Sequence, residues 1–141
     1  MDELITIFPE SEKEAIERFC SEYENEINTP NGFVVVCKYP VETAKHICGG
    51  KKRKFQSTRA RYILWPKYIF LHPEERIVLQ DNKTKNLIFF HEEKSIAYAV
   101  ICRPLRGGKL DLISGFVVRG TRAVKYREGR PPYSFYKKKS C

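Results

Sequence analysis

The 141-residue sequence lacks the spaced motifs that mark the commonest nucleotide and hydrolase sites. It has no G-x-x-x-x-G-K phosphate loop, no G-x-G-x-x-G and no G-x-S-x-G. The sequence therefore gives no indication of a P-loop enzyme, a dinucleotide-binding enzyme or an α/β-hydrolase.

Metal ligands and paired thiols are also scarce. The chain has five cysteines, an odd number, and no two are spaced as C-x-x-C. This pattern favours neither a disulfide framework nor a zinc site. Acidic residues do not cluster in the basic part of the chain, which argues against a two-metal nuclease. We expect no metal and no cofactor.

No apolar run approaches the length that spans a membrane, and the acidic N-terminal stretch has no signal-peptide core. We therefore expect no membrane association and a cytoplasmic, reducing location. Four of the cysteines lie in apolar patterns and are expected to be buried free thiols.

Charge is abundant but unevenly distributed. The chain carries 26 Lys and Arg against 17 Asp and Glu, a formal net charge of +9. Residues 1–30 sum to −7 and residues 31–141 to +16. A basic body of this kind favours a polyanionic partner, most simply nucleic acid. The acidic end reads as a detachable shield for the basic surface, or as an aid to solubility alone.

The first half of the sequence reads as mainly helical. Residues 9–28 are expected to form a helix with Ser11 as its N-cap and Glu14 as the capping-box partner. Residues 33–39 read as a short strand, and 40–50 as a helix with Pro40 in its first turn and His46 in its last. Residues 57–65 fit another helix, which ends before Pro66.

Strand patterns dominate after residue 75. Four strand-like runs follow between residues 76 and 118, separated by the short turn signals "DNKTK", "EEK" and "PLRGGK". Short links of this kind predict antiparallel hairpins. The expected fold is one α+β domain over 1–141, with N-terminal helices packed on a four-stranded antiparallel β-sheet. It divides into an acidic N-terminal helix (1–30), a core (31–118) and a basic aromatic tail (119–141).

One stretch, "KHICGGKKRKFQSTRAR" at 45–61, concentrates the basic charge. It holds one histidine, two glycines, seven Lys or Arg and no carboxylate. The run from Lys51 to Lys54 fits a loop that contacts phosphates, and it also fits a nuclear-import signal. In the first interpretation, Lys51, Lys52, Arg53 and Lys54 hold an RNA backbone.

His, Arg, Ser and Tyr around a sheet are the residue types that metal-independent RNA cleavage uses. The ribose 2′-OH attacks the neighbouring phosphate, a general base takes its proton and a general acid protonates the leaving 5′ oxygen. Arginine and lysine stabilise the extra charge on the phosphate in the transition state.

The helix ending in "KHI", the basic spacer, "RARYILWPKYIFLHPEERIVL" and the strands "IAYAVICR" and "DLISGFVV" resemble the barnase/EndoU/colicin/RelE-like (BECR) ribonuclease superfamily. The likeness is to its phage-linked and polymorphic-toxin members and covers residues 40–118. It implies helices packed on a four-stranded antiparallel sheet, a cofactor-independent endoribonuclease of the toxin type, and a cognate antitoxin or immunity protein.

The resemblance also implies site residues. His46 matches the histidine or lysine at the end of the helix before the sheet, and Arg59 or Arg61 matches the arginine that follows. Ser114 matches a hydroxyl on the final strand, where it also fits a tolerated polar residue. RNA contacts are expected from the 51–54 run and from Arg103, Arg119 and Tyr133.

A second function stays open. The same basic face with exposed aromatics fits a non-catalytic RNA- or DNA-binding module. The tail aromatics, Tyr126, Tyr133, Phe135 and Tyr136, either stack on bases or pin the tail to the domain.

Overall fold

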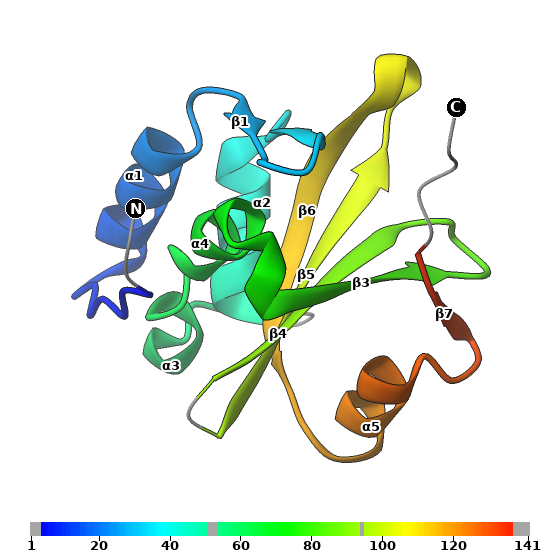
Figure 1. The fold of residues 1–141 in the computed structure, drawn as a ribbon. Helices are drawn as coiled ribbons and strands as arrows, with labels where there is room; N and C mark the ends of the chain where they lie inside the picture. The colour runs from blue at the N-terminus through cyan, green and yellow to red at the C-terminus, as the bar shows by residue number, and fades with distance from the viewer. Residues whose placement is uncertain (1–3, 51–53, 94, 137–141) are drawn as a thin grey trace.

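The computed structural model describes residues 4–50, 54–93 and 95–136. A seven-stranded mixed sheet forms the centre, with the strand order β1-β2-β6-β5-β4-β3-β7. Helices α1 to α4 lie on one side of this sheet and α5 lies on the other (Figure 1). The α+β class expected from the sequence is confirmed, but the sheet has seven strands rather than four.

The expected antiparallel meander is present within the larger sheet. It consists of β3 (Arg76–Asp81), β4 (Leu87–Glu93), β5 (Ile96–Pro104) and β6 (Lys109–Val118), each antiparallel to the next. A register shift at Ile101/Cys102 interrupts the pairing of β5 with β6. Short 3₁₀ turns at Pro73–Glu75 and Arg106–Gly108 precede β3 and β6.

Three short strands extend the meander beyond the expected four. They are β1 (Ile27–Asn28), β2 (Val34–Val36) and β7 (Tyr133–Phe135). Strand β2 runs parallel to β6, and this makes the sheet mixed. Strand β2 was expected as a short strand over 33–39, but its pairing was not, and β1 and β7 have too few residues to show an alternating pattern.

Asp111 ties β2 to the meander. Its side chain is 1% exposed, accepts a hydrogen bond from the Lys38 backbone N–H at 3.0 Å and pairs with Arg103 at 2.9 Å. The carboxylate thereby accepts a hydrogen bond from the backbone of the segment that connects β2 to α2.

Helix α1 (Glu12–Glu22) begins as expected but ends earlier. Ser11 accepts a hydrogen bond from Glu14 N at 3.1 Å, and the Glu14 carboxylate accepts one from Glu10 N at 3.0 Å. The expected helix over 9–28 is too long, because the Tyr23 hydroxyl donates to Ile63 O at 2.8 Å and fixes the chain there. Ile27 then pairs with Val35 in the sheet.

The acidic N-terminal region is not detachable. Ala15, Phe19 and Tyr23 are each at most 3% exposed and belong to the main core beneath the sheet. Phe19 and Tyr23 stack with their ring centroids 4.3 Å apart. The expectation that the acidic end is detachable is therefore wrong, because removing α1 would expose this core to solvent.

The helix expected over 40–50 is confirmed, with Pro40 in its first turn and His46 in its last, whereas the helix expected over 57–65 is shorter than expected. Helix α2 covers Pro40–Gly49, α3 covers Ser57–Ala60, and α4 covers Trp65–Leu71. Pro66 lies in the first turn of α4 instead of following a helix, a position where its missing N–H costs no hydrogen bond.

A second, smaller core lies on the other face of the sheet, under α5 (Gly120–Glu128). Tyr126 packs there against Phe90 and Tyr133. The basic tail is thus folded onto the domain as far as residue 136. Cys48 and Cys102 are buried free thiols, whereas Cys20 and Cys37 are only partly buried. No helix in the described part of the chain is long and apolar enough to cross a bilayer.

We predict that Phe19→Ala lowers the free energy of unfolding by about 3–5 kcal/mol, the usual cost of truncating a buried phenylalanine. Urea unfolding measures this. Lys13→Ala, at an exposed position of the same helix, is the control and should change stability by less than about 0.5 kcal/mol. Equal stability of the two variants would show that α1 does not contribute to the packing of the core.

Candidate functional site

Three arginines, two from the region of α3 and one from the chain after β6, line one cavity of about 380 Å³. It lies between the end of α2, the α3 region, the β5–β6 pair and the start of α5. Its polar lining consists of Gln56, Thr58, Arg59, Arg61, Tyr62, Tyr98 and Arg119. We call it the arginine cavity. None of the described residues that line it is acidic.

Arg59 is fixed by the end of helix α2. Its Nε donates to Ile47 O at 2.9 Å, so the guanidinium satisfies a carbonyl that the helix leaves open. Gly50, the C-cap residue, has a φ of +61°. A Cβ on Gly50 would lie 3.1 Å from Arg59 Cζ, so glycine provides both the backbone conformation and the space for the guanidinium.

Arg61 enters the cavity just after α3. Its Nε is buried and has no hydrogen-bond partner among the described residues. Its backbone carbonyl accepts a hydrogen bond from Ile7 N at 3.1 Å, which attaches the N-terminal segment to this edge. A buried guanidinium N–H without a partner is a donor available to an anion.

Arg119 comes from the other end of the chain. It is exposed, in an extended conformation, and precedes the first residue of α5. Its side chain therefore completes the cavity from the side opposite α3 and is not needed for packing.

The hydroxyl of Tyr98 is the polar group at the base of the cavity. Tyr98 is 1% exposed, and its Oη has no hydrogen-bond partner among the described residues. Burial raises the pKa of this phenol well above its usual range, although the charge of Arg59 acts in the opposite direction. The group is thus a neutral hydrogen-bond donor at physiological pH.

Gly115 on β6 makes room for that hydroxyl. A Cβ at Gly115 would lie 2.7 Å from Tyr98 Oη, closer than side-chain carbons approach oxygen. The rings of Tyr62 and Trp65 lie 5.9 and 5.5 Å from the Tyr98 ring and hold it in place. Tyr98 is therefore a rigid donor.

Together these groups make an anion-binding cavity. Three arginines and no described carboxylate line the cavity, so its lining is positively charged and attracts an anion. Arginine forks match the oxygens of a phosphate, and the Tyr98 O–H adds a neutral donor.

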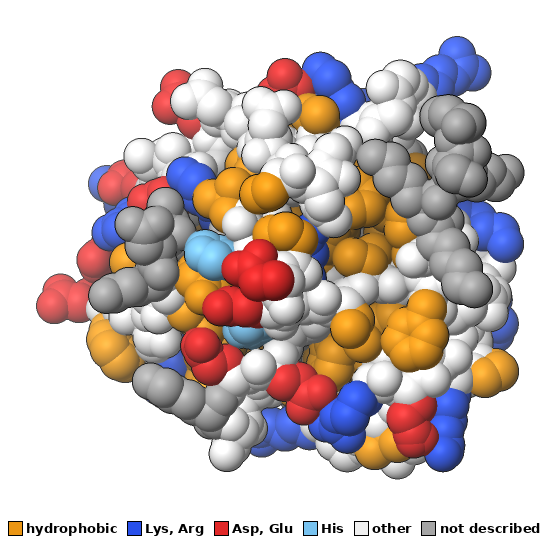
Figure 2. Space-filling view, in the orientation of Figure 1, with side chains coloured by type: hydrophobic (Ala, Val, Ile, Leu, Met, Phe, Trp, Pro, Cys, Tyr) orange, Lys and Arg blue, Asp and Glu red, His pale blue; other side chains and the backbone are white. Residues whose placement is uncertain are grey.

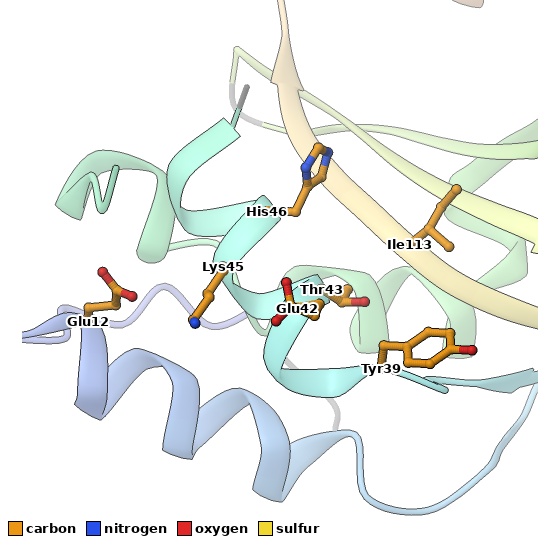
Figure 3. Close-up of a pocket in the computed structure, with 7 residues that line it drawn as sticks. All are labelled: Glu12, Tyr39, Glu42, Thr43, Lys45, His46 and Ile113. Carbon is orange, nitrogen blue, oxygen red and sulfur yellow. The ribbon is translucent and has the colours of Figure 1, made fainter. Parts of the chain in front are cut away.

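His46 lies in a neighbouring groove of about 710 Å³ between α2 and β6. Figure 3 shows its ring pointing from α2 toward β6, on the side of the helix opposite Glu12 and Lys45. Glu12, Glu42 and Lys45 also line this groove. Because it carries two carboxylates against one lysine, the groove suits a phosphate less well than the arginine cavity does.

The two hollows have no described lining residue in common, but the last turn of α2 contributes a residue to each. Ile47, the residue after His46, lines the arginine cavity, and the Gly50 backbone N–H bonds to His46 O. The Arg59 guanidinium packs against the same Gly50. His46 and Arg59 thus flank one helical turn, a rise of about 5.4 Å.

The structure brings together three of the expected site residues, Arg59, Arg61 and Arg119. It places Ser114 elsewhere, since this residue pairs with Ile101, whose side chain packs in the second core on the opposite face of the sheet. Arg103 is held by Asp111, and Tyr133 packs against Tyr126.

The structure describes only part of the basic run over residues 51–54. Lys51, Lys52 and Arg53 are outside the described residues, and Lys54 is exposed. The backbone of Lys54 lies 2.9 Å from where a Cβ of Gly49 would be, so the chain returns closely to the end of α2 after the run.

Sequence reasoning did not identify Tyr98 or Tyr62 as site residues. Tyr98 belongs to the apolar alternation of "IAYAVICR", where a tyrosine reads as core. The only available signal was the hydroxyl itself, because a buried phenol ordinarily finds a hydrogen-bond partner.

The face of the molecule drawn in Figure 2 has the opposite character. Acidic side chains gather beside histidines near its centre, while lysines and arginines lie mostly toward its edges. Elsewhere in the structure, the Tyr68 hydroxyl donates to Glu75 at 2.7 Å, and the His91 ring Nδ1 lies 2.9 Å from Glu75 O. The acidic side chains near the centre of the face in Figure 2 repel a polyanion. Among the described residues, no group of three or more His, Cys, Asp or Glu is arranged to hold a metal ion.

We predict that Tyr98→Phe and Tyr23→Phe have opposite effects on stability. Tyr98→Phe should raise the free energy of unfolding by about 1 kcal/mol or leave it unchanged, because it removes a buried hydroxyl without a partner. Tyr23→Phe should lower it by about 1–3 kcal/mol, because that hydroxyl bonds Ile63 O and Lys67 N.

Urea unfolding of the two variants measures the difference. Titration with inorganic phosphate should also show roughly 10- to 150-fold weaker binding to Tyr98→Phe, the loss expected for a hydrogen bond to a charged group. Destabilisation of Tyr98→Phe to the level of Tyr23→Phe would show that its hydroxyl serves packing and not a ligand.

Comparison with known proteins adds no further constraint on this site. No protein-family model, curated protein or solved structure matches the chain. The resemblance to the BECR ribonuclease superfamily therefore depends on the quoted sequence patterns alone, and the assignment of a function depends on the geometry of the arginine cavity.

Proposed function

We propose that the arginine cavity binds a phosphodiester of RNA and that this chain is a metal-independent endoribonuclease. The observation that carries the proposal is the convergence of Arg59, Arg61 and Arg119 around the neutral hydroxyl of Tyr98, with no acidic residue among the described lining. These are the donors that a phosphate with developing negative charge needs.

The reaction follows from the chemistry of RNA itself. The ribose 2′ oxygen forms a bond to the adjacent phosphorus, the bond from phosphorus to the 5′ oxygen breaks, and a 2′,3′-cyclic phosphate results. The 2′-OH proton goes to a general base, and the leaving 5′ oxygen takes a proton from a general acid. Arg59 and Arg61 would stabilise the non-bridging oxygens, with Tyr98 donating a further hydrogen bond.

His46 is the proposed general base. It lies on the last turn of α2, whose C-cap Gly50 packs against Arg59, and it lines the groove between α2 and β6. A strand whose phosphate lies in the cavity would present its ribose toward this turn. Imidazole is the side chain whose usual pKa suits proton transfer near neutral pH.

A second function, non-catalytic RNA binding, is favoured by one observation. His46 lines the neighbouring groove and is not among the described residues that line the arginine cavity itself. A binding module would use the three arginines without any proton transfer. In either case, a protein partner that blocks the cavity, such as an antitoxin, would have to present carboxylates to it.

We predict that the purified chain cleaves RNA in the presence of EDTA and leaves 2′,3′-cyclic phosphate ends. His46→Ala should slow cleavage by about 10²–10⁴-fold, the usual contribution of a general base, while RNA affinity stays nearly constant. End-group analysis and a gel-based rate assay measure both quantities.

Arg119→Ala tests the binding step, because this side chain is exposed and its loss should not disturb the fold. It should reduce the slope of log affinity against log salt by about 0.7, the value for one phosphate contact on a single strand. Arg106→Ala, an equal change of charge on the exposed β5–β6 turn, should leave cleavage unchanged. RNA binding without cleavage by the parent would favour the second function, and equal effects of the two arginine variants would contradict both.

A further inference from the structure

Phe8 is a large aromatic side chain held out in solvent. It is 74% exposed, well above the other exposed large hydrophobics, the next of which is Tyr39 at 57%. A phenylalanine in this position contributes little to folding, because its ring remains largely in water.

The backbone on both sides of Phe8 is anchored. Ile7 packs against the main core and its N–H donates to Arg61 O, and Pro9 is buried. Two residues later, Ser11 caps helix α1. The exposure of Phe8 therefore follows from how its neighbours are fixed and not from a loose chain end.

The ring lies beside Arg61. Its centroid is 5.6 Å from Arg61 Cζ, a cation–π distance, and Arg61 lines the arginine cavity. Arg61 therefore connects Phe8, which lines a separate hollow, to the proposed phosphate site. A ligand that binds Arg61 through a phosphate has an aromatic ring within reach of its next group.

The surface around Phe8 favours the binding of a base over the binding of a second phosphate. A shallow hollow of about 360 Å³ beside it is lined by Phe8, Glu14, Glu17, Arg18 and others. Arg18 is paired with Glu22 at 3.3 Å, so the carboxylates dominate the rim. Such a rim repels a phosphate but tolerates an uncharged base, whose ring can stack on the phenylalanine.

We propose that Phe8 is the stacking platform of a base subsite: it binds the unpaired base next to the phosphate that the arginine cavity holds. This inference rests on the proposed function, since it takes RNA as the ligand of the cavity. The arginines bind the RNA backbone whatever the RNA sequence is. Phe8 adds affinity only where a base is present and unstacked.

Two 2′-O-methyl hexanucleotides test the inference, because they lack the 2′-OH and cannot be cleaved by its attack. One carries six adenines, and the other has the same six-residue backbone without bases. Fluorescence anisotropy at fixed low salt should show that Phe8→Ala weakens binding of the adenine hexamer by about 5- to 150-fold, the range for loss of one stacked base. Binding of the abasic hexamer should not change.

Two further variants serve as controls. Phe8→Trp should bind the adenine hexamer at least as well as the parent. Phe135→Ala, which removes a 49% exposed aromatic on β7 outside the cavity lining, should have no effect on either hexamer.

The outcomes separate this inference from the proposed function. Equal loss for both hexamers in Phe8→Ala would overturn the base subsite, because Phe8 would then act only by supporting Arg61. Parent-like binding of the adenine hexamer by Phe8→Ala would overturn it as well, with the phosphate site intact. Failure of the parent to bind either hexamer would overturn the proposed function and this inference together.

Discussion

The positive lining of one cavity, with buried hydrogen-bond donors that have no partner among the described residues, is the constraint on which the proposed function depends. Arg59, Arg61 and Arg119 meet in one cavity where no described residue of the lining offers a carboxylate. Two of the donors there, Arg61 Nε and Tyr98 Oη, are buried without a hydrogen-bond partner among the described residues. An unpaired buried donor costs about 1–3 kcal/mol, so an anion that accepts from these groups would remove a cost that the folded chain carries. Unpaired buried groups call for an explanation, and an anion in the cavity supplies one for these two.

The rest of the fold keeps these groups in place. Gly50 ends α2 with room for Arg59, Gly115 leaves space on β6 for Tyr98, and the Trp65 and Tyr62 rings hold the phenol. Helix α1 closes the core behind them, and its N-terminal extension reaches Arg61 through the Ile7 hydrogen bond. Residues from both ends of the chain therefore converge on the cavity, and a local change at either end should reach it through packing.

The sequence predicted the parts of this protein that have a long local pattern. The helix at residue 12 has a specific cap, the strand at residue 34 lies in a run of β-branched residues, and the meander from 76 to 118 consists of strand-like runs separated by turn signals. Strands β1 and β7 are too short to show such a pattern, and the parallel pairing of β2 with β6 is a tertiary property. Among the site residues, arginines stood out by charge, whereas Tyr98 was hidden within an apolar strand. Ser114 was assigned to the site through the resemblance, as a hydroxyl on the final strand, but its face of the sheet is set by its pairing with Ile101 next to the register shift at Ile101/Cys102.

The most direct test of the arginine cavity is an NMR titration of the arginine side-chain Nε–H signals with the uncleavable adenine hexamer. Each signal reports on one guanidinium, so the measurement locates the phosphates without relying on cleavage. The account predicts saturable shifts for Arg59, Arg61 and Arg119, with Arg103 and Arg127 unchanged because Asp111 and Glu92 hold them elsewhere. Shifts confined to other arginines, or spread equally over all of them, would contradict it.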